Sequence, residues 1–184
     1  MLRAGVIVFG FVILIASFGV RADQSDPRLE RLFGDLAKAE YLSDARDVER
    51  KIWNLWEMPA EREARIPFSV GVNFMGEGLL EAARDSFSEA IAIAPDFAEA
   101  YNKRATVLYY MGDLEGSIAD IQKTLALEPR HFGAMSGMAM ISRDLGREEA
   151  ALEMLVRIKK IYPAMQGIDE RIDLMEAVVQ RERI

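Results

Sequence analysis

The chain has 184 residues, of which 51% are hydrophobic and 29% are charged, a composition that suits one ordinary globular domain. The absence of cysteine excludes disulfides and thiolate metal sites within the chain. A formal net charge of -7 argues against a nucleic-acid partner, because binding to phosphates needs a basic face that displaces counterions.

Residues 1–22 differ in kind from the rest of the chain. Arg3 supplies a positive n-region, residues 4–20 are uncharged and largely apolar, and a small residue, Ala22, stands where a signal peptidase cleaves. We therefore predict a secretory signal that is cleaved after Ala22 and an exported protein, periplasmic in a bacterial cell. The alternative is an uncleaved membrane anchor, because the length of this uncharged run lies at the lower edge of the ~17–25 residues that span a bilayer.

Residues 23–63 are predicted to form a degenerate pair of helices. An apolar helical face lies between Asp26 and Lys38, and a second amphipathic helix follows it. Trp53 and Trp56 lie three positions apart on this second helix, where burial in the pair is favoured over exposure as a partner site. We expect the pair to stand ahead of the repeats and shield the first one, because helical arrays need end units with a polar outer face.

Three stretches then superimpose on one another with a constant period, namely 64–97, 98–131 and 132–165. One glycine and one proline recur in each copy: Gly78, Gly112 and Gly146, with Pro95, Pro129 and Pro163. A period of about 34 residues is typical of arrays of helix-turn-helix repeats. The glycine is expected to take the left-handed conformation at the end of a first helix, and the proline to end a second helix.

Small and large apolar positions recur with the same period. Gly71, Ala105 and Ala139 occupy one small position, and Ala83, Ser117 and Ala151 occupy a second. Phe87, Ile121 and Leu155 occupy a large apolar position. Small residues where helices cross, beside large ones, suit ridge-into-groove packing. The sequence therefore predicts an all-α fold, a right-handed α-solenoid of helix-turn-helix repeats. Residues 166–184 are expected to form a C-terminal capping helix with one apolar stripe.

The segment 98–131 resembles the tetratricopeptide repeat in its aromatic, small, Gly-Asp and terminal proline positions. The copies at 64–97 and 132–165 are similar to the same family, the latter more loosely. The whole chain is similar to small secreted repeat proteins of alphaproteobacteria that share its NKRAT and EPRHFGA segments. The resemblance implies a scaffold or adaptor that is not an enzyme and binds protein or peptide in a concave groove built from the first helices.

Nine residues of the first helices are candidates for partner binding: Phe68, Val72, Met75, Asn102, Thr106, Tyr109, Tyr110, Met140 and Arg143. The groove they form is expected to be apolar at the first repeat and more polar toward the third. It could take an extended peptide or a partner helix. Some of the aromatic and methionine side chains could instead pack against neighbouring helices. The groove lacks the lysine and asparagine set with which some family members bind a C-terminal carboxylate.

Arg104 occupies a packing position that holds Val70 in the first copy and Met138 in the third. A charge on a packing face costs free energy unless it is paired and hydrogen-bonded. Asp120, on the opposing helix of the same repeat, is the expected partner, and Glu128 is another candidate. The favoured interpretation is a structural ion pair that fixes the register of the repeats. The alternative is that Arg104 anchors an acidic partner.

His131 is the single histidine and follows closely after Pro129, where a helix-start or packing role is expected. No HExxH, glycine-rich phosphate loop or GxSxG motif occurs, so no catalytic residue, cofactor or metal is predicted. A hydrolase that uses His131 is one alternative. Another is a membrane-anchored assembly factor with its repeats in the periplasm, which requires that residues 1–22 stay uncleaved.

Overall fold

The computed structural model describes residues 23–182, which hold nine α-helices, one short 3-10 helix and no strand. The helices are α1 (Arg28–Lys38), α2 (Leu42–Trp56), η1 (Arg62–Ala64), α3 (Arg65–Gly76), α4 (Leu80–Ile93), α5 (Ala98–Tyr110), α6 (Leu114–Leu127), α7 (Phe132–Asp144), α8 (Glu148–Ile161) and α9 (Ile168–Glu182). The predicted signal at residues 1–22 lies outside the described residues. Among the helices described, none combines the length and the apolar character that crossing a bilayer requires.

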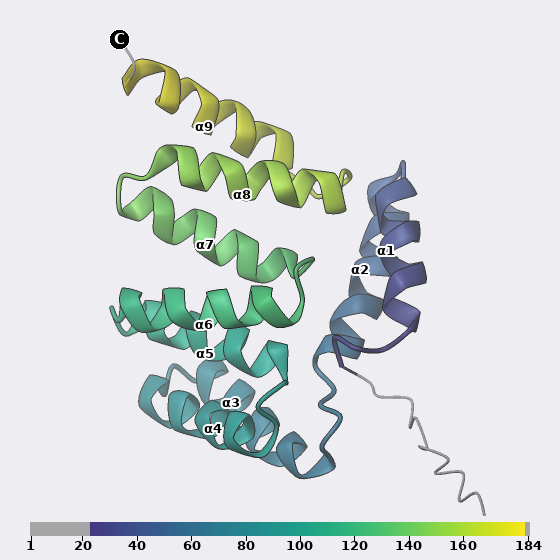
Figure 1. The fold of residues 1–184 in the computed structure, drawn as a ribbon, viewed down its shortest axis with the longest axis vertical. Helices are drawn as coiled ribbons and strands as arrows, with labels where there is room; N and C mark the ends of the chain where they lie inside the picture. Colours follow the sequence, from purple (N-terminus) through teal and green to yellow (C-terminus); the bar gives the residue numbers. More distant parts are fainter. Residues whose placement is uncertain (1–22, 183–184) are drawn as a thin grey trace, which may run out of the picture.

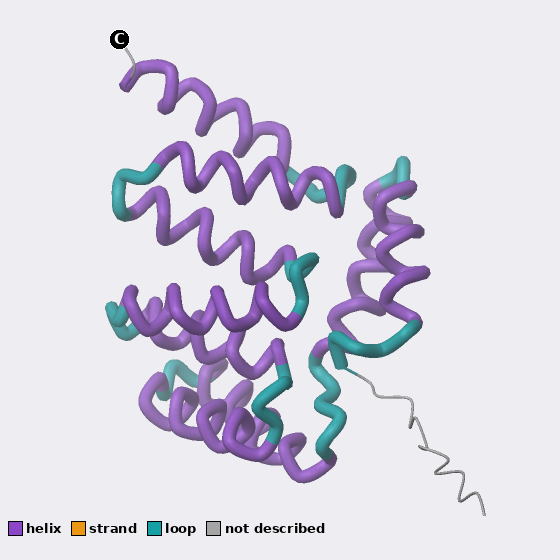
Figure 2. Tube along the Cα trace, in the orientation of Figure 1, coloured by secondary structure: helices purple, strands orange, loops and turns teal. Residues whose placement is uncertain are grey.

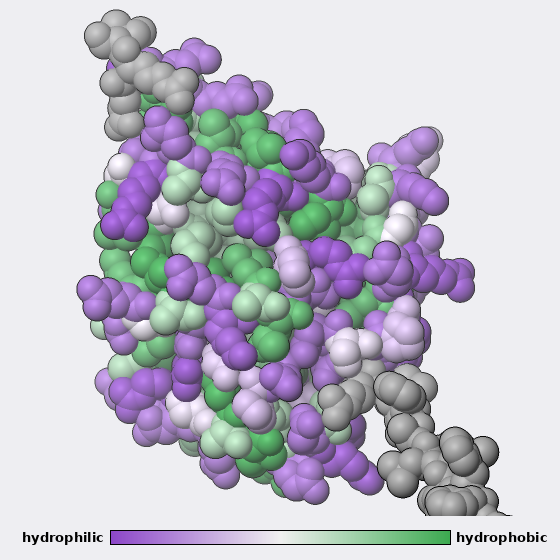
Figure 3. All heavy atoms as spheres, in the orientation of Figure 1, coloured by the Kyte–Doolittle hydropathy of each residue, from purple (hydrophilic) through white to green (hydrophobic). Residues whose placement is uncertain are grey.

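Helices α3 to α8 form three antiparallel hairpins that stack one on the next, and α9 lies on α8 (Figure 1). Within each hairpin the two helices pack together, and neighbouring hairpins meet through α4 with α5 and through α6 with α7. The prediction of an all-α helical repeat fold is confirmed. The last helix, α9, buries its apolar stripe against α8. Figure 3 shows hydrophilic side chains between the apolar patches on one face of the molecule.

Glycine ends the first helix of each repeat, as the period of the sequence predicts. Gly78, Gly112 and Gly146 have φ values of 76°, 82° and 64°, in the left-handed region that favours glycine. At the middle repeat, the Gly112 N–H donates to the Tyr109 carbonyl at 3.0 Å. The next residue, Asp113, caps α6 by accepting from the Gly116 N–H at 2.9 Å.

The contact between the two helices of each hairpin depends on a small residue opposite a large one. In the first repeat a Cβ added at Gly71 would lie only 2.7 Å from Cε1 of Phe87, whose side chain is fully buried. In the second repeat the Ser117 hydroxyl donates to the Ala105 carbonyl at 2.8 Å, so a polar residue is accommodated at the same crossing. The small positions identified by their period are therefore points where helices approach closely.

The N-terminal pair does not stand ahead of the first repeat, so that prediction was wrong. Helices α1 and α2 lie beside the array and pack against its edge at α7 and α8, and the loop after α2 runs back to α3 (Figures 1 and 2). The third repeat carries Phe132 and Tyr162 at positions where the first repeat carries Ala64 and Ala94. These large apolar side chains lie at the third repeat, and the buried face of α2 packs against them.

Trp56 is at the centre of the contact between the pair and the repeats. Its indole stacks on the His131 ring with centroids 4.1 Å apart, and it also contacts Phe33 and Phe132. Trp53 meets the Phe132 ring edge-on at 5.4 Å and keeps part of its surface in water. Trp56 is thus buried as predicted, but against the repeats as well as within its own pair.

Candidate functional site

Two adjoining hollows follow the first helices of the array. The larger has a volume of about 390 Å³ and lies between α5, α7 and α9, and the smaller has about 40 Å³ and lies between α5 and α7. Thr106, Gly133, Gly137 and Met140 line both, so the hollows form one continuous surface, which we call the repeat groove. A concave, mixed polar and apolar surface of this kind suits a peptide chain.

The structure brings five of the predicted groove residues together. Thr106 and Met140 line both hollows, Arg143 lines the larger one, and Asn102 and Tyr109 line the smaller one. The Tyr109 hydroxyl donates to Oδ2 of Asp144 at 2.6 Å, which ties the end of α5 to the end of α7. Tyr109 therefore has a structural contact in addition to its place at the groove.

The first repeat contributes less to the groove than the sequence predicts. Phe68 is buried in an aromatic cluster, where its ring centroid lies 4.8 Å from that of Phe97 and 5.7 Å from that of Phe87. These contacts remove its side chain from water. Val72 and Met75 pack partly against the same cluster. These three residues were expected to form the apolar end of the groove, and none lines either hollow.

Tyr110 also lies outside the two hollows. It is 65% exposed and its ring meets that of Tyr109 edge-on at 5.6 Å. Because α5 ends at Tyr110, its side chain lies at the last turn of the helix rather than on the groove floor. An exposed tyrosine at this position borders the groove without forming its wall.

A buried polar cluster lies beside the groove and was not predicted from the sequence. The Glu99 carboxylate receives the Asn102 amide at 2.9 Å and the Lys103 ammonium at 3.1 Å, and its Oε2 lies 2.9 Å from Nε2 of His131. Nδ1 of His131 accepts the Ala134 N–H at 3.1 Å, so the ring proton belongs on Nε2 and is donated to Glu99. Glu99 and His131 are both removed from solvent.

The charges in this cluster stabilise one another. Burial alone would raise the pKa of Glu99, but the hydrogen bond from His131 and the positive charge of Lys103 outweigh it and hold that pKa below its usual value. Burial likewise opposes the charge on Lys103, and the neighbouring carboxylates of Glu99 and Glu57 raise its pKa overall. His131 therefore caps α7 and supports a buried carboxylate, with neither ring nitrogen left for a substrate.

Sequence reasoning missed Glu99 because the period conceals it. The equivalent positions in the neighbouring copies hold Arg65 and Gly133, so the repeat pattern shows no common residue type there. The single histidine was the available signal, since a buried imidazole next to a helix start needs a polar partner. Among the described residues no group of three or more His, Asp or Glu side chains is placed to hold a metal ion.

Arg104 forms a bidentate ion pair with Asp120, as the favoured interpretation predicts. Its Nε donates to Oδ2 at 2.7 Å and its Nη2 donates to Oδ1 at 2.8 Å, while Nη1 reaches the Ser88 hydroxyl at 3.0 Å. Ser88 is on α4, so the guanidinium joins the first repeat to both helices of the second. The other candidate, Glu128, pairs with Arg130.

Comparison with known proteins identifies the family. The sequence model of the tetratricopeptide repeat matches residues 98–131. A TPR repeat-containing protein of Rhizobium etli is 34% identical over 148 residues, which cover 80% of this chain and 72% of that protein. The chain belongs to the tetratricopeptide repeat (TPR) family. The Rhizobium relative agrees with the expected resemblance to alphaproteobacterial repeat proteins.

More distant TPR proteins share parts of the sequence or the fold. Tetratricopeptide repeat protein 36 of Danio rerio is 33% identical over 75 residues, 41% of this chain and 40% of its own. The first TPR of Spaghetti (RPAP3), bound to an HSP90 peptide, superimposes with a TM-score of 0.62 at 15% identity, covering 65% of this chain and 98% of that one. MamA superimposes with a TM-score of 0.60 at 16% identity, covering 77% and 86%.

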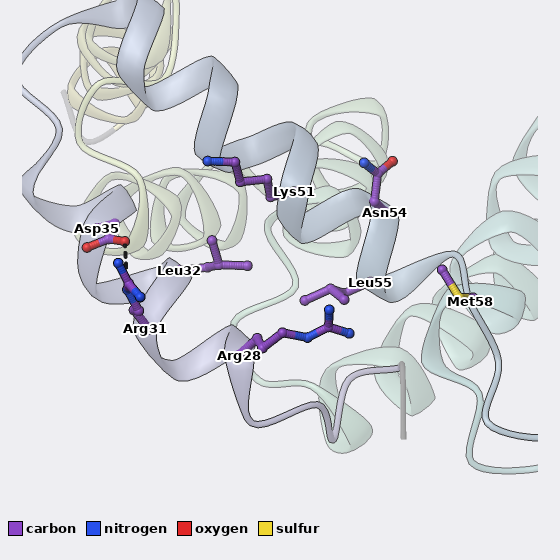
Figure 4. Close-up of a pocket in the computed structure, with 8 residues that line it drawn as sticks. All are labelled: Arg28, Arg31, Leu32, Asp35, Lys51, Asn54, Leu55 and Met58. Atoms are coloured by element: carbon purple, nitrogen blue, oxygen red, sulfur yellow. Dashed lines mark ion pairs between the residues drawn. The ribbon is translucent and has the colours of Figure 1, made fainter. Parts of the chain in front are cut away.

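This TPR protein has another hollow at the N-terminal pair. It has a volume of about 530 Å³ and lies between α1 and α2, over Leu32 and Leu55 (Figure 4). Its arginines already have acidic partners close in sequence, because Arg28 pairs with Asp26 at 2.7 Å and Arg31 approaches Asp35 at 3.8 Å. This hollow shares no lining residue with the repeat groove and so offers a matched control site.

Proposed function

We propose that this TPR protein is an exported, non-catalytic scaffold that binds a protein or peptide partner in the repeat groove. The observation that carries the proposal is the 390 Å³ hollow between α5, α7 and α9. Its lining combines flexible apolar side chains, Met140 and Leu174, with the hydroxyls of Thr106 and Ser136. Apolar surface supplies affinity and a few polar groups fix orientation, which is the composition of a peptide-binding site.

Two proteins with the same fold support a peptide-binding function. The structure of the first TPR of Spaghetti was solved with an HSP90 peptide, and the TPR2B domain of yeast Sti1 was solved in complex with pHsp70. The non-catalytic part of the proposal rests on His131, which is buried and engaged at both ring nitrogens. A hydrolase would need that imidazole within reach of substrate.

Export is proposed from the sequence of residues 1–22, with cleavage after Ala22 and a periplasmic location in a bacterial cell. N-terminal sequencing of the protein isolated from its native cell tests this directly. An N-terminus at Asp23 supports the cleaved scaffold. An N-terminus at Met1 in the membrane fraction supports instead the alternative of an anchored assembly factor.

Site-specific photocrosslinking in the cell tests the groove. A photoreactive residue replaces Leu174, which is 67% exposed in the larger hollow, and a matched control replaces Ile93, which is 37% exposed on α4 outside both hollows. We expect the Leu174 position to capture a discrete partner that the Ile93 position does not. Equal capture of the same proteins from both positions would show that partners do not use the groove.

A further inference from the structure

Two arginines enter the larger hollow from different helices. Arg143 comes from the last turn of α7 and Arg171 from the first turn of α9. The lining of this hollow contains no aspartate or glutamate, although the chain has 30 acidic residues against 23 basic ones. An acidic protein thus presents a locally positive surface inside its groove, which attracts negative charge.

The guanidinium of Arg171 has no hydrogen bond or ion pair within the part of the chain that the structure describes. Residues three and four positions away on a helix are the nearest partners for a charged side chain. Around Arg171 these are Gly167, Ile168, Leu174 and Met175, none of which is acidic. The sequence of α9 therefore leaves this charge to be paired by something outside the helix.

Arg143 is held in place but only partly used. Its Nε and Nη2 donate to one oxygen, Oδ1 of Asp144, at 3.3 and 3.0 Å. The other oxygen of Asp144 accepts the Tyr109 hydroxyl, so the carboxylate is fixed between α5 and α7. Nη1 of Arg143 has no hydrogen bond among residues 23–182, and the side chain is 61% exposed. The guanidinium lines the hollow with donors to spare.

The two positive charges also affect each other. Desolvation by neighbouring atoms and then the charge of Arg143 lower the pKa of Arg171 below its ordinary value. Both guanidiniums stay charged at neutral pH, because arginine does not lose its proton in proteins under these conditions. An anionic group bound to each guanidinium would offset this repulsion and satisfy the free donors.

We propose, on the basis of the proposed scaffold function, that the larger hollow binds a partner segment with two acidic side chains, one for each guanidinium. Arginine donates two parallel hydrogen bonds to a carboxylate, which gives both affinity and orientation. Two arginines on separate helices offer two such contacts, one to each acidic side chain. Met140 and Leu174 complete the site by packing an apolar residue next to the acids.

Peptide selection tests this proposal. The full chain, purified after processing by its host, is presented with two display libraries of short random peptides. In the first library neutral constant segments flank the random residues on both sides, and in the second the random residues end at a free C-terminus. We expect the first library to yield peptides with paired Asp or Glu residues beside an apolar residue.

The selected peptides are then measured by fluorescence anisotropy against variants. Arg143→Gln and Arg171→Gln should each weaken binding about tenfold, the size of one lost charge-assisted contact. Arg31→Gln, in the hollow between α1 and α2, is the matched control and should change binding less than about twofold. Selection from the free C-terminal library alone, or equal loss in the control, overturns the proposal.

The remaining outcomes separate this proposal from the scaffold function. The libraries could instead yield peptides without acidic residues, whose binding is weakened by Met140→Ala but is unchanged in the two arginine variants. That result would overturn the acidic specificity and leave the groove as the binding site. Failure of both libraries to yield any binder would contradict the acidic specificity. If the crosslinking positions Leu174 and Ile93 also capture the same proteins equally, this failure would contradict the scaffold function as well.

Discussion

Replacing Gly71 by alanine tests whether the fold depends on matched sizes where helices cross. The new Cβ would lie 2.7, 2.8 and 3.0 Å from three ring atoms of Phe87, closer than carbon atoms approach without strain. Phe87 is fully buried in a cluster with Phe68 and Phe97, so a shift of its ring must displace other core side chains. The second and third repeats already have alanine at this position, but opposite the slimmer Ile121 and Leu155.

The expected loss combines two opposite effects. Overpacking a core by one methyl group costs about 1–3 kcal/mol, because side chains or backbone must shift. Alanine in place of glycine inside a helix returns about 1 kcal/mol. We therefore expect Gly71→Ala to lower the free energy of unfolding by up to about 2 kcal/mol. Gly34→Ala in α1, where nothing lies within 4 Å of the added Cβ, should raise it by about 0.5–1 kcal/mol.

Urea denaturation followed by far-UV circular dichroism measures these changes. The double variant Gly71→Ala/Phe87→Leu reproduces the pair found in the third repeat and should recover stability relative to the sum of the single changes. We expect a coupling energy of at least about 1 kcal/mol from the double-mutant cycle. Additive effects, or a Gly71→Ala protein as stable as the Gly34→Ala control, would refute the size-matching argument.

Two further predictions concern the ionic groups. Arg104→Met should lower the free energy of unfolding by about 2–4 kcal/mol, because Asp120 stays buried without its counter-charge. Adding Asp120→Leu should restore most of the lost stability. An unchanged melting temperature together with lost partner binding would contradict the structural role of Arg104. The pKa of Glu99 is below its ordinary value of 4.5, so the stability it contributes is complete above that pH and is lost as the pH falls through the lower folded-state pKa. The free energy of unfolding of Glu99→Gln should therefore depend less on pH in the acid range than that of the wild-type protein. Identical acid denaturation curves for the two proteins would contradict a stabilising role for the Glu99 carboxylate.

The period of the sequence was enough to predict the array, because glycine and proline act on the backbone locally. Gly112 takes a left-handed conformation where it ends a helix, and α6 ends just before Pro129. The docking of α1 and α2 could not be predicted in this way. It depends on where the fold brings large apolar side chains to the edge of the array, and Phe132 and Tyr162 meet there only once α7 and α8 have packed together.

The groove was predicted in part, for a similar reason. Thr106 and Met140 follow from the helical period, whereas the inward turn of Phe68 depends on its aromatic neighbours on α4 and at Phe97. Arg171 was missed because the last helix was treated only as a cap. It lies one full period after Gly137, and Leu174 lies one full period after Met140, so extending the repeat pattern once more would have placed both in the groove.

The contact between the N-terminal pair and the repeats links parts of the chain that are far apart in sequence. Glu30 meets Arg130 over a separation of 100 residues, and Glu49 meets the Tyr162 hydroxyl over 113. Repeat arrays ordinarily contact only their neighbours and can fold one unit at a time. Here α1 and α2 leave the ribosome before the third repeat, which supplies Phe132 and Tyr162 to the surface that they pack against. The N-terminal pair can therefore dock only after most of the array has been made, and a chain that stops before His131 lacks the His131 and Phe132 rings against which Trp56 packs.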